Sequence, residues 1–140
     1  MTETVDPLQG TPRPTLAFIG AGRAGSALAR ALAEAGHRII AVHSRTDGHA
    51  IQLASATGAA VAPTALAAMR SADLTFATVP DAEIVRVAAT IAATGMALPG
   101  RSLVHCSATH GPDVLSALRS TAADVGAFHP LQALAGASSA

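Results

Sequence analysis

The chain has 140 residues, of which 50% are hydrophobic and 13% are charged, and its formal net charge at pH 7 is zero. A chain of this length can form one domain with a hydrophobic core. The lack of a basic surplus, of tryptophan and of tyrosine argues against nucleic-acid binding through phosphate contacts or base stacking. The single cysteine, Cys106, excludes a disulfide framework and a cysteine-rich metal site, and we expect a reducing, cytoplasmic location.

Three prolines, Pro7, Pro12 and Pro14, stand among polar residues near the beginning of the chain. We expect residues 1–14 to form a disordered leader, because such a segment has little apolar surface to bury. This segment lacks the apolar core of a signal peptide, and no apolar run in the chain reaches the roughly 18 residues of a membrane span. We therefore expect no membrane among the partners of the protein.

From residue 15 onward, short apolar runs alternate with segments of helical composition. The apolar runs predict about six strands, at 16–19, 39–42, 59–62, 73–79, 101–106 and 123–128. The first helix follows the first strand, with Leu28, Leu32 and Ala35 on one face, and ends at Gly36. Further helices are predicted at 47–57, 63–70, 81–93 and 112–120. This alternation is typical of an α/β fold, here a Rossmann doubly wound parallel sheet in three αβα layers with strand order 3-2-1-4-5-6.

A glycine-rich turn between the first strand and the first helix indicates dinucleotide binding. Gly20, Gly22 and Gly25 have the spacing G-x-G-x-x-G inside a β-α-β unit that spans 15–45. Gly20 allows a tight turn, Gly22 lets a pyrophosphate approach the backbone, and Gly25 lets the helix pack closely on the sheet. The N–H groups at the start of the helix then face the phosphates. The predicted pyrophosphate-binding residues are Gly20, Ala21, Gly22, Arg23, Ala24 and Gly25.

The end of the second strand predicts which dinucleotide is bound. An NAD site usually has an acidic residue there, which binds the ribose 2′-hydroxyl. Here the residues are Ser44, Arg45 and Thr46, and a guanidinium attracts a 2′-phosphate and can bind it through two hydrogen bonds. We therefore predict NADP as the cofactor. Asp47 leaves NAD open as an alternative, because its carboxylate could take the place of the missing acid.

The segment after the fourth strand is the next candidate, because ligands of such sheets bind at the carboxyl ends of the strands. This segment leaves its strand beside the glycine-rich turn, so we expect the backbone of Val79 and Pro80 to contact the cofactor. Asp81 is assigned a structural role at the beginning of the next helix, where a carboxylate interacts favourably with the helix dipole.

The loop after the fifth strand, 105–111, contains two histidines, a serine and the single cysteine. Its position predicts contact with the nicotinamide end of the cleft, where His105 or His110 could donate a proton and Ser107 could hold a substrate oxygen. We take His105 and Ser107 as the candidate catalytic residues, and helix capping is the alternative role for residues of this loop. A Cys–His nucleophile has less support, because no acidic residue nearby would orient the histidine.

His129 precedes Pro130 at the end of the sixth predicted strand and could also point into the cleft. The roles of His110 and His129 stay open. Neither a carboxylate nor a helical pair of histidines accompanies these residues in the spacing of a metal site, so we expect no metal.

Taken together, these motifs resemble the Rossmann-like N-terminal half of a family of oxidoreductases whose C-terminal half is a helical domain of unknown function. The matching segments are GAGRAGSALARALAEAGH, VHSR, TVPDAEI, HCS and HPLQ, which together cover roughly 15–134. The resemblance extends more distantly to pyrroline-5-carboxylate reductase, prephenate dehydrogenase and the 6-phosphogluconate dehydrogenase-like enzymes. One local departure is Ala108, because relatives tend to have glycine after the corresponding HxS motif.

The resemblance implies an NADP-dependent oxidoreductase that transfers hydride to or from a small keto or hydroxy acid, for example one similar to ketopantoate. It also implies that 15–134 form the dinucleotide-binding domain and that 135–140 are a tail or the start of a linker to an absent helical domain. In the family that helical half closes the substrate site and mediates dimerisation. We therefore expect a homo-oligomer, and poor activity of these 140 residues alone. A stand-alone, non-catalytic NADP-binding sensor or partner module is the alternative.

Overall fold

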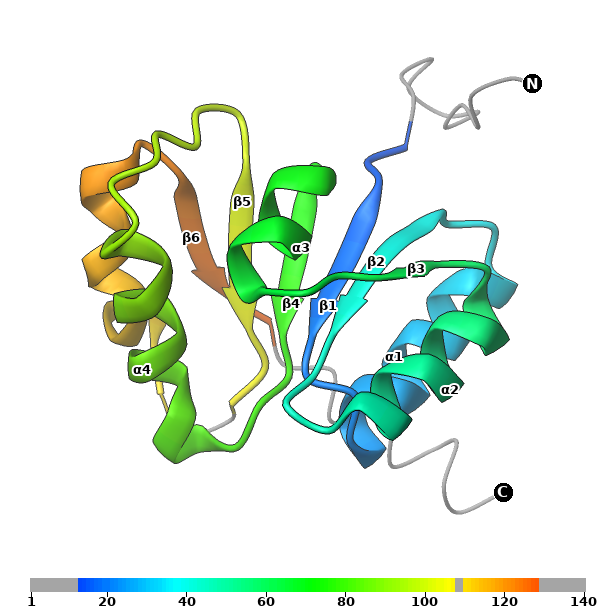
Figure 1. Ribbon diagram of the computed structural model, residues 1–140. Coiled ribbons are helices and arrows are strands. Elements are labelled where there is room, and N and C mark those ends of the chain that lie inside the picture. Colours follow the sequence, from blue (N-terminus) through cyan, green and yellow to red (C-terminus); the bar gives the residue numbers. More distant parts are fainter. Residues whose placement is uncertain (1–12, 108–109, 129–140) are drawn as a thin grey trace.

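The computed structural model describes residues 13–107 and 110–128, which form one parallel sheet covered by helices (Figure 1). The strands are β1 (Leu16–Ile19), β2 (Ile39–His43), β3 (Ala60–Val61), β4 (Leu74–Ala77), β5 (Ser102–His105) and β6 (Asp124–Ala127). The helices are α1 (Arg23–Glu34), α2 (Asp47–Thr57), α3 (Ala65–Ser71), α4 (Asp81–Ala92) and the 3₁₀ helix η1 (Pro112–Thr121). The strand order is β3-β2-β1-β4-β5-β6, and all neighbouring strands are parallel. The predicted fold class and strand order are therefore confirmed.

The alternating side chains of β1 divide the hydrophobic core into two layers. Leu16 and Phe18 are buried in a cluster with residues of α1 and α2. Ala17 and Ile19 are buried in a second cluster with residues of α3, α4 and η1, and α3 and α4 lie in front of the sheet in Figure 1. Because β1 is buried on both faces, it reads as a continuous apolar run in the sequence.

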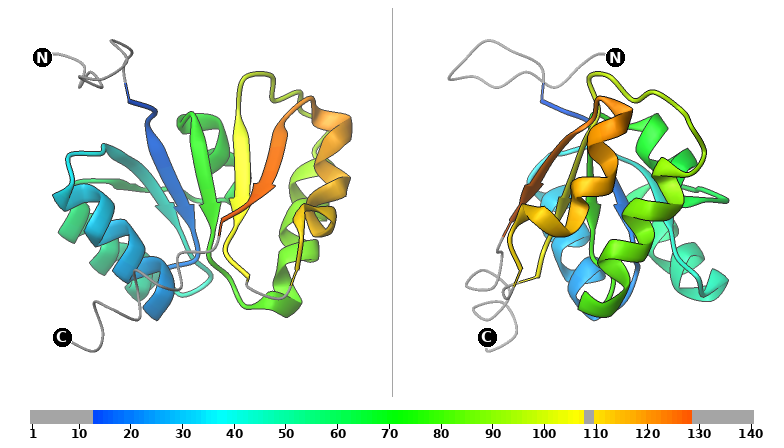
Figure 2. Two further views of the ribbon diagram at one scale, coloured as in Figure 1. Left: turned by 180° about the vertical axis from the view of Figure 1, so that it is seen from behind. Right: turned by 90° about the vertical axis from the view of Figure 1, so that its left-hand side faces the viewer.

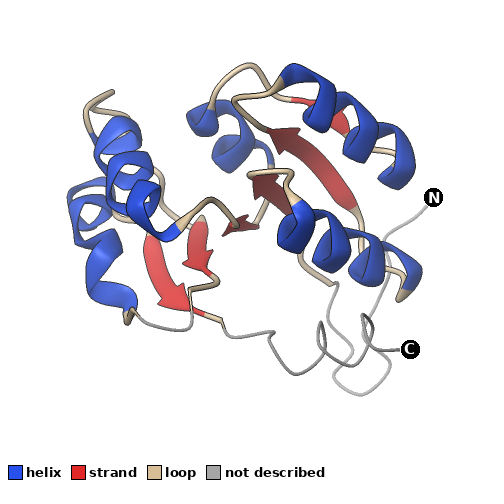
Figure 3. Cartoon of the chain, turned by 90° about the horizontal axis from the view of Figure 1, so that it is seen from below, coloured by secondary structure: helices blue, strands red, loops and turns tan. Residues whose placement is uncertain are grey.

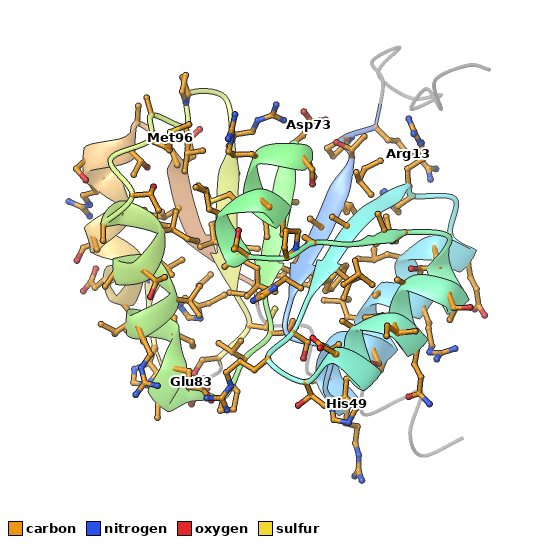
Figure 4. The ribbon with its side chains drawn as sticks, viewed as in Figure 1. Arg13, His49, Asp73, Glu83 and Met96 are labelled. Carbon is orange, nitrogen blue, oxygen red and sulfur yellow. The ribbon has the colours of Figure 1, made fainter. Side chains whose placement is uncertain are left out.

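The parallel strands all end at the same edge of the sheet, which is the lower edge in Figure 1 and faces the viewer in Figure 3. Figure 4 shows Glu83 and His49 at this edge and Asp73 at the opposite one. There, Asp73 accepts hydrogen bonds from the backbone N–H and the hydroxyl of Thr15, at 2.9 and 3.1 Å, and lies 3.5 Å from the Arg101 guanidinium. These contacts join the segments that lead into β1, β4 and β5.

Helices α1, α3, α4 and η1 differ from the prediction by a residue or two at one or both ends. Helix α1 ends at Glu34, so the exposed Ala35 is its C-terminal cap and not part of the buried face. Helix α3 begins at Ala65 rather than at 63, because the Thr64 hydroxyl accepts a hydrogen bond from the Ala67 N–H at 3.0 Å and caps the helix. The predicted helix at 112–120 has 3₁₀ geometry. Helix α2 begins and ends where it was predicted, and Gly58 ends it with a left-handed backbone (φ 77°).

Strand β1 has the predicted bounds and β2 extends one residue further, whereas the other four strands are shorter than predicted at both ends. Strand β4 ends at Ala77 rather than at 79, so Thr78 and Val79 belong to the loop that borders the site. Strand β3 contains only Ala60 and Val61, and both are exposed at the edge of the sheet. A short strand at this position leaves few unpaired backbone groups at the edge of the sheet.

One half of the sheet is covered on a single face in the described part of the chain. Helices α1 and α2 lie over β1, β2 and β3, whereas β4, β5 and β6 are seen from behind without a helix in front of them (Figure 2, left). A row of aromatic rings runs onto this open half: the rings of Phe18 and Phe76 are stacked with centroids 5.1 Å apart, and those of Phe76 and Phe128 are tilted with centroids 5.7 Å apart. Phe128, at the end of the row, is 42% exposed.

Two neighbouring side chains of α2 test the assignment of its buried face. Leu53 is 1% exposed and Ile51 is 58% exposed, although both are large aliphatic residues on the same helix. We predict that Leu53→Ala lowers the free energy of unfolding by about 2–5 kcal/mol, because it removes packed methyl groups and leaves a cavity. Ile51→Ala should change it by less than about 1 kcal/mol. Urea denaturation of both variants measures this difference, and equal losses would mean that α2 packs on the sheet with another face.

Candidate cofactor-binding site

The glycine-rich turn at the end of β1 is held against the end of β4. The Thr78 hydroxyl donates a hydrogen bond to the Gly20 carbonyl at 2.8 Å, and the Gly20 N–H donates one to the His43 carbonyl at 2.7 Å. Gly20 has a φ of 106°, and a Cβ built on it would lie 2.8 Å from the Thr78 carbonyl oxygen. A Cβ on Gly25 would lie 2.7 Å from the Gly20 carbonyl oxygen. Neither position can hold a side chain without displacing the turn.

Gly22 differs from these two glycines because its environment is open. It is exposed, and a Cβ built on it would meet no protein atom within 4 Å. Gly22 is also the N-cap of α1, where no side chain caps the helix and no acidic residue stands in the first turn. The first N–H groups of an α-helix have no partners within the helix, and the dipole there favours an anion. An open backbone at an uncapped helix start fits a pyrophosphate.

A cleft with a volume of about 450 Å³ begins at this turn and extends between the end of β2 and helix α4. It is lined by the predicted cofactor residues Gly20, Ala21, Gly22, Ser44, Arg45, Thr46, Val79 and Pro80. The other three predicted residues lie outside its lining: Arg23 and Ala24 are exposed at the start of α1, and Gly25 is buried beneath the turn. The structure thus brings the three predicted cofactor segments together around one cleft of the size typical for small-molecule ligands.

The residues at the end of β2 present donors but no carboxylate to the cleft. The Thr46 N–H donates a hydrogen bond to the Ser44 hydroxyl at 3.2 Å, which shapes the turn into α2. His43 is half-buried, and its Nδ1 lies 3.0 Å from the Ala62 carbonyl oxygen. Asp47 is exposed in the first turn of α2 and does not line the cleft. This arrangement gives little support to Asp47 as a ribose ligand.

Several residues of the cleft were missed by the sequence analysis. Its wall also includes the segment 63–65 and, from α4, Glu83, Arg86, Val87 and Thr90. Glu83 Oε2 lies 3.0 Å from an Arg45 terminal nitrogen, so an ion pair joins the two sides of the cleft. The predicted strand order places the ends of β2 and β4 on either side of β1. From this order it could have been predicted that α4, which follows β4, faces the end of β2. Asp81 and Glu83 both stand in the first turn of α4, which agrees with the structural role expected for Asp81.

The loop after β5 is organised around His105, which is fully buried. The Ser107 N–H donates a hydrogen bond to His105 Nδ1 at 3.1 Å. Nδ1 therefore accepts, and Nε2 donates to the Gly111 carbonyl oxygen at 2.7 Å. His105 and Ser107 both lie outside the lining of the described cleft, and Ser107 is buried as well. Both ring nitrogens of His105 are engaged within the loop, and the catalytic roles of His105 and Ser107 stay predictions.

The other candidates of this region are placed as follows. Burial raises the pKa of the Cys106 thiol to about 11, so the thiol carries its proton at neutral pH and is a poor nucleophile. This reduces the support for the Cys–His alternative. His110 is exposed before η1, and His129 lies outside the described residues.

Two further features concern residues 13–107 and 110–128, which the structure describes. In this part of the chain, no helix is long and apolar enough to cross a membrane. The same residues contain no cluster of three or more histidine, cysteine, aspartate or glutamate side chains that could hold a metal ion.

Comparison with known proteins gives a family and a set of similar folds. The family model described as "NADP oxidoreductase coenzyme F420-dependent" matches residues 15–109. The chain is similar to an imine reductase from Pseudomonas sp., with 23% identity, a TM-score of 0.67, and coverage of 82% of this chain and 40% of that one. It is similar to the imine reductase from Myxococcus stipitatus in complex with NADP+, with 29% identity, a TM-score of 0.61, and coverage of 82% and 41%. It is also similar to the V8 variant of the Myxococcus stipitatus enzyme in complex with NAD+. This comparison has 27% identity, a TM-score of 0.62, and coverage of 83% of this chain and 41% of that one. No curated protein sequence matches the chain.

The coverage values show how much of each relative this chain matches. The chain spans about two fifths of the length of these imine reductases. The predicted resemblance to the Rossmann-like half of an oxidoreductase family is confirmed, and at the level of the family so is NADP as the cofactor. The family match over residues 15–109 covers more than half of the chain, which is therefore an NAD(P)-dependent oxidoreductase domain that belongs to the family of NADP oxidoreductases described as coenzyme F420-dependent.

Proposed function

We propose that this domain binds NADP(H) as the cofactor half of an oxidoreductase. The observation that carries the proposal is the continuity of the cleft, which joins an open, uncapped helix start at Gly22 to the guanidinium of Arg45. The amides from Gly20 to Gly25 would hold the pyrophosphate. Arg45 would hold the 2′-phosphate, with Ser44 and Thr46 as further donors. Val79 and Pro80 line the same cleft, which supports contacts between their backbone and the ribose or nicotinamide.

A bound nicotinamide cofactor supplies or accepts a hydride, so the substrate must contain a group that can accept or release one. We propose a small keto or hydroxy acid, with a ketopantoate-like acid as one example. An imine is a second candidate, and the solved imine reductases that are 27–29% identical to this chain favour it. In both cases His105 or Ser107 would act near the reacting atom, His105 as a proton donor and Ser107 as a hydrogen-bonding partner of the substrate.

The domain organisation is also a proposal. We propose that residues 15–134 form the dinucleotide-binding domain and that a helical half completes the substrate site and mediates homodimerisation. The structural neighbours, which are more than twice as long as the matched region, support this organisation. The alternative is a non-catalytic NADP-binding sensor or partner module. A longer form of the protein that reduces keto acids or imines with NADPH would favour the enzyme, and binding without turnover would favour the module.

The glycine-rich turn provides the first test. We predict that Gly22→Val abolishes measurable NADPH binding, because the added side chain would occupy the space of the pyrophosphate. The fold should persist, since a Cβ at this position meets no protein atom within 4 Å. Isothermal titration calorimetry measures the binding, and Ala31→Val, which adds methyl groups to an exposed position of α1 outside the cleft, is the matched control. Unchanged affinity in Gly22→Val would place the pyrophosphate elsewhere.

Arg45 tests the choice between the two nicotinamide cofactors. We predict that the wild-type domain prefers NADPH to NADH. A charge-assisted contact with two hydrogen bonds contributes roughly 1.5–3 kcal/mol, so Arg45→Ala should weaken NADPH binding by about 10- to 150-fold and leave NADH binding nearly unchanged. Arg30→Ala removes the same charge from the exposed surface of α1 and serves as the control. Equal losses for both cofactors would assign Arg45 a structural role.

The proposed catalytic roles in the loop after β5 can be tested only with a protein that turns over substrate. The experiment therefore uses a form of the protein that includes the helical half. We predict that His105→Ala and Ser107→Ala leave NADPH affinity within about 2-fold of wild type, because both residues lie outside the described cleft. Removal of a general acid typically reduces turnover by about 10²–10⁴-fold. Steady-state kinetics and calorimetry measure the two effects separately. Full turnover in both variants would move proton donation to another part of the protein.

A further inference from the structure

The ion pair between Arg45 and Glu83 spans the cleft at the place where we propose the 2′-phosphate binds. Arg45 comes from the turn after β2, and Glu83 comes from the first turn of α4, so the pair links segments on opposite sides of the glycine-rich turn. The distance from the Arg45 terminal nitrogen to Glu83 Oε2 is 3.0 Å. Glu83 stands at the edge where the strands end (Figure 4). A terminal nitrogen that a phosphate would use is therefore occupied in this structure by a carboxylate.

The two partners of this ion pair differ in exposure. The Glu83 side chain is 17% exposed, whereas the Arg45 side chain is 73% exposed. The carboxylate is thus held in the cleft wall by its surroundings, while the guanidinium extends into solvent and has room to move. Arg86, on the same helix as Glu83, also lines the cleft, so α4 contributes a cation as well as an anion to this wall. The more exposed Arg45 side chain is therefore the partner with more freedom to turn toward an anion in the cleft.

We propose that Glu83 is a specificity-determining residue that limits the preference of this site for NADPH over NADH. The proposal rests on the function proposed above, because it needs a 2′-phosphate beside Arg45. Glu83 competes with the 2′-phosphate for the Arg45 guanidinium, and its negative charge repels the phosphate. NADH carries a hydroxyl at this position, so neither effect applies to it.

The expected changes in NADPH affinity are small, because the Arg45–Glu83 ion pair is partly exposed to solvent. Ion pairs with an exposed partner contribute little to stability, so release of Arg45 from Glu83 should lower NADPH affinity by at most about 5-fold. Repulsion between a carboxylate and a phosphate across several ångströms at high effective dielectric adds a comparable or smaller factor, which salt reduces. Removal of the Glu83 charge should therefore strengthen NADPH binding by about 3- to 10-fold.

The experiment compares NADPH and NADH binding by calorimetry in the wild type, Glu83→Gln, Glu83→Ala and Arg45→Ala/Glu83→Gln. Glu34→Gln removes one negative charge at the exposed end of α1 and is the matched control. Circular dichroism and thermal unfolding show whether each variant folds. We expect both Glu83 variants to bind NADPH about 3- to 10-fold more tightly at low salt, with NADH and the Glu34 control changed by less than about 2-fold. In the Arg45→Ala background the gain should shrink, because only the repulsion remains.

Other outcomes would overturn the proposal in identifiable ways. Weaker NADPH binding in Glu83→Gln would show that Glu83 orients Arg45 for the phosphate instead of competing with it. Equal changes for NADPH and NADH would show that Glu83 acts on a part of the dinucleotide that both cofactors share. A gain of the same size with or without Arg45 would exclude competition for the guanidinium. A folded wild type that binds neither cofactor would contradict the proposed function itself, and the role of Glu83 with it.

Discussion

The candidate site depends on the close approach of two backbone segments, the glycine-rich turn after β1 and the loop after β4. The Gly20 carbonyl accepts the Thr78 hydroxyl at 2.8 Å, and the space between the segments has no room for a Cβ at Gly20 or Gly25. This contact sets where α1 begins, and the beginning of α1 is the uncapped end that we assign to the pyrophosphate. Gly20 and Gly25 are thus required by the protein's own packing, whereas we propose that Gly22 is required by the ligand.

The strand order of the sheet determines which charged side chains lie beside the glycine-rich turn. Because β2 and β4 both neighbour β1, their ends stand on either side of the glycine-rich turn, and the cleft opens between them. The end of β2 contributes Arg45 and the helix after β4 contributes Glu83, and these two charges meet across the cleft. The two sides of the cleft therefore present the cation that we assign to a 2′-phosphate and an anion that would oppose this phosphate. Cofactor preference at this site is accordingly a balance between two side chains.

Much of this fold and part of the site could be predicted from the sequence, since both depend on local patterns. The alternation of apolar runs with helical segments predicted the strand order. The glycine spacing and Arg45 predicted two cleft-lining segments, and the position after the fourth strand predicted the third, at Val79 and Pro80. Glu83 was missed as a cleft residue because its role arises from a contact with Arg45, which is distant in the sequence, and no local pattern records such a contact. Thr64 was missed as a cap because Pro63 offered an equally plausible helix start. Burial of His105, with both ring nitrogens bonded within its own loop, is likewise a property of the folded chain.

The backbone amides that respond when the cofactor binds give the most direct test of where the dinucleotide lies. Titration of ¹⁵N-labelled protein with NADP+ and separately with NAD+, followed by NMR chemical shifts, reports each amide independently. We predict saturable shifts that are largest from Gly20 to Gly25 with both cofactors, and shifts from Ser44 to Thr46 that are larger with NADP+ than with NAD+. Saturable shifts confined to η1 and β6, or no saturable shift at the glycine-rich turn, would contradict the assignment of this cleft to the dinucleotide.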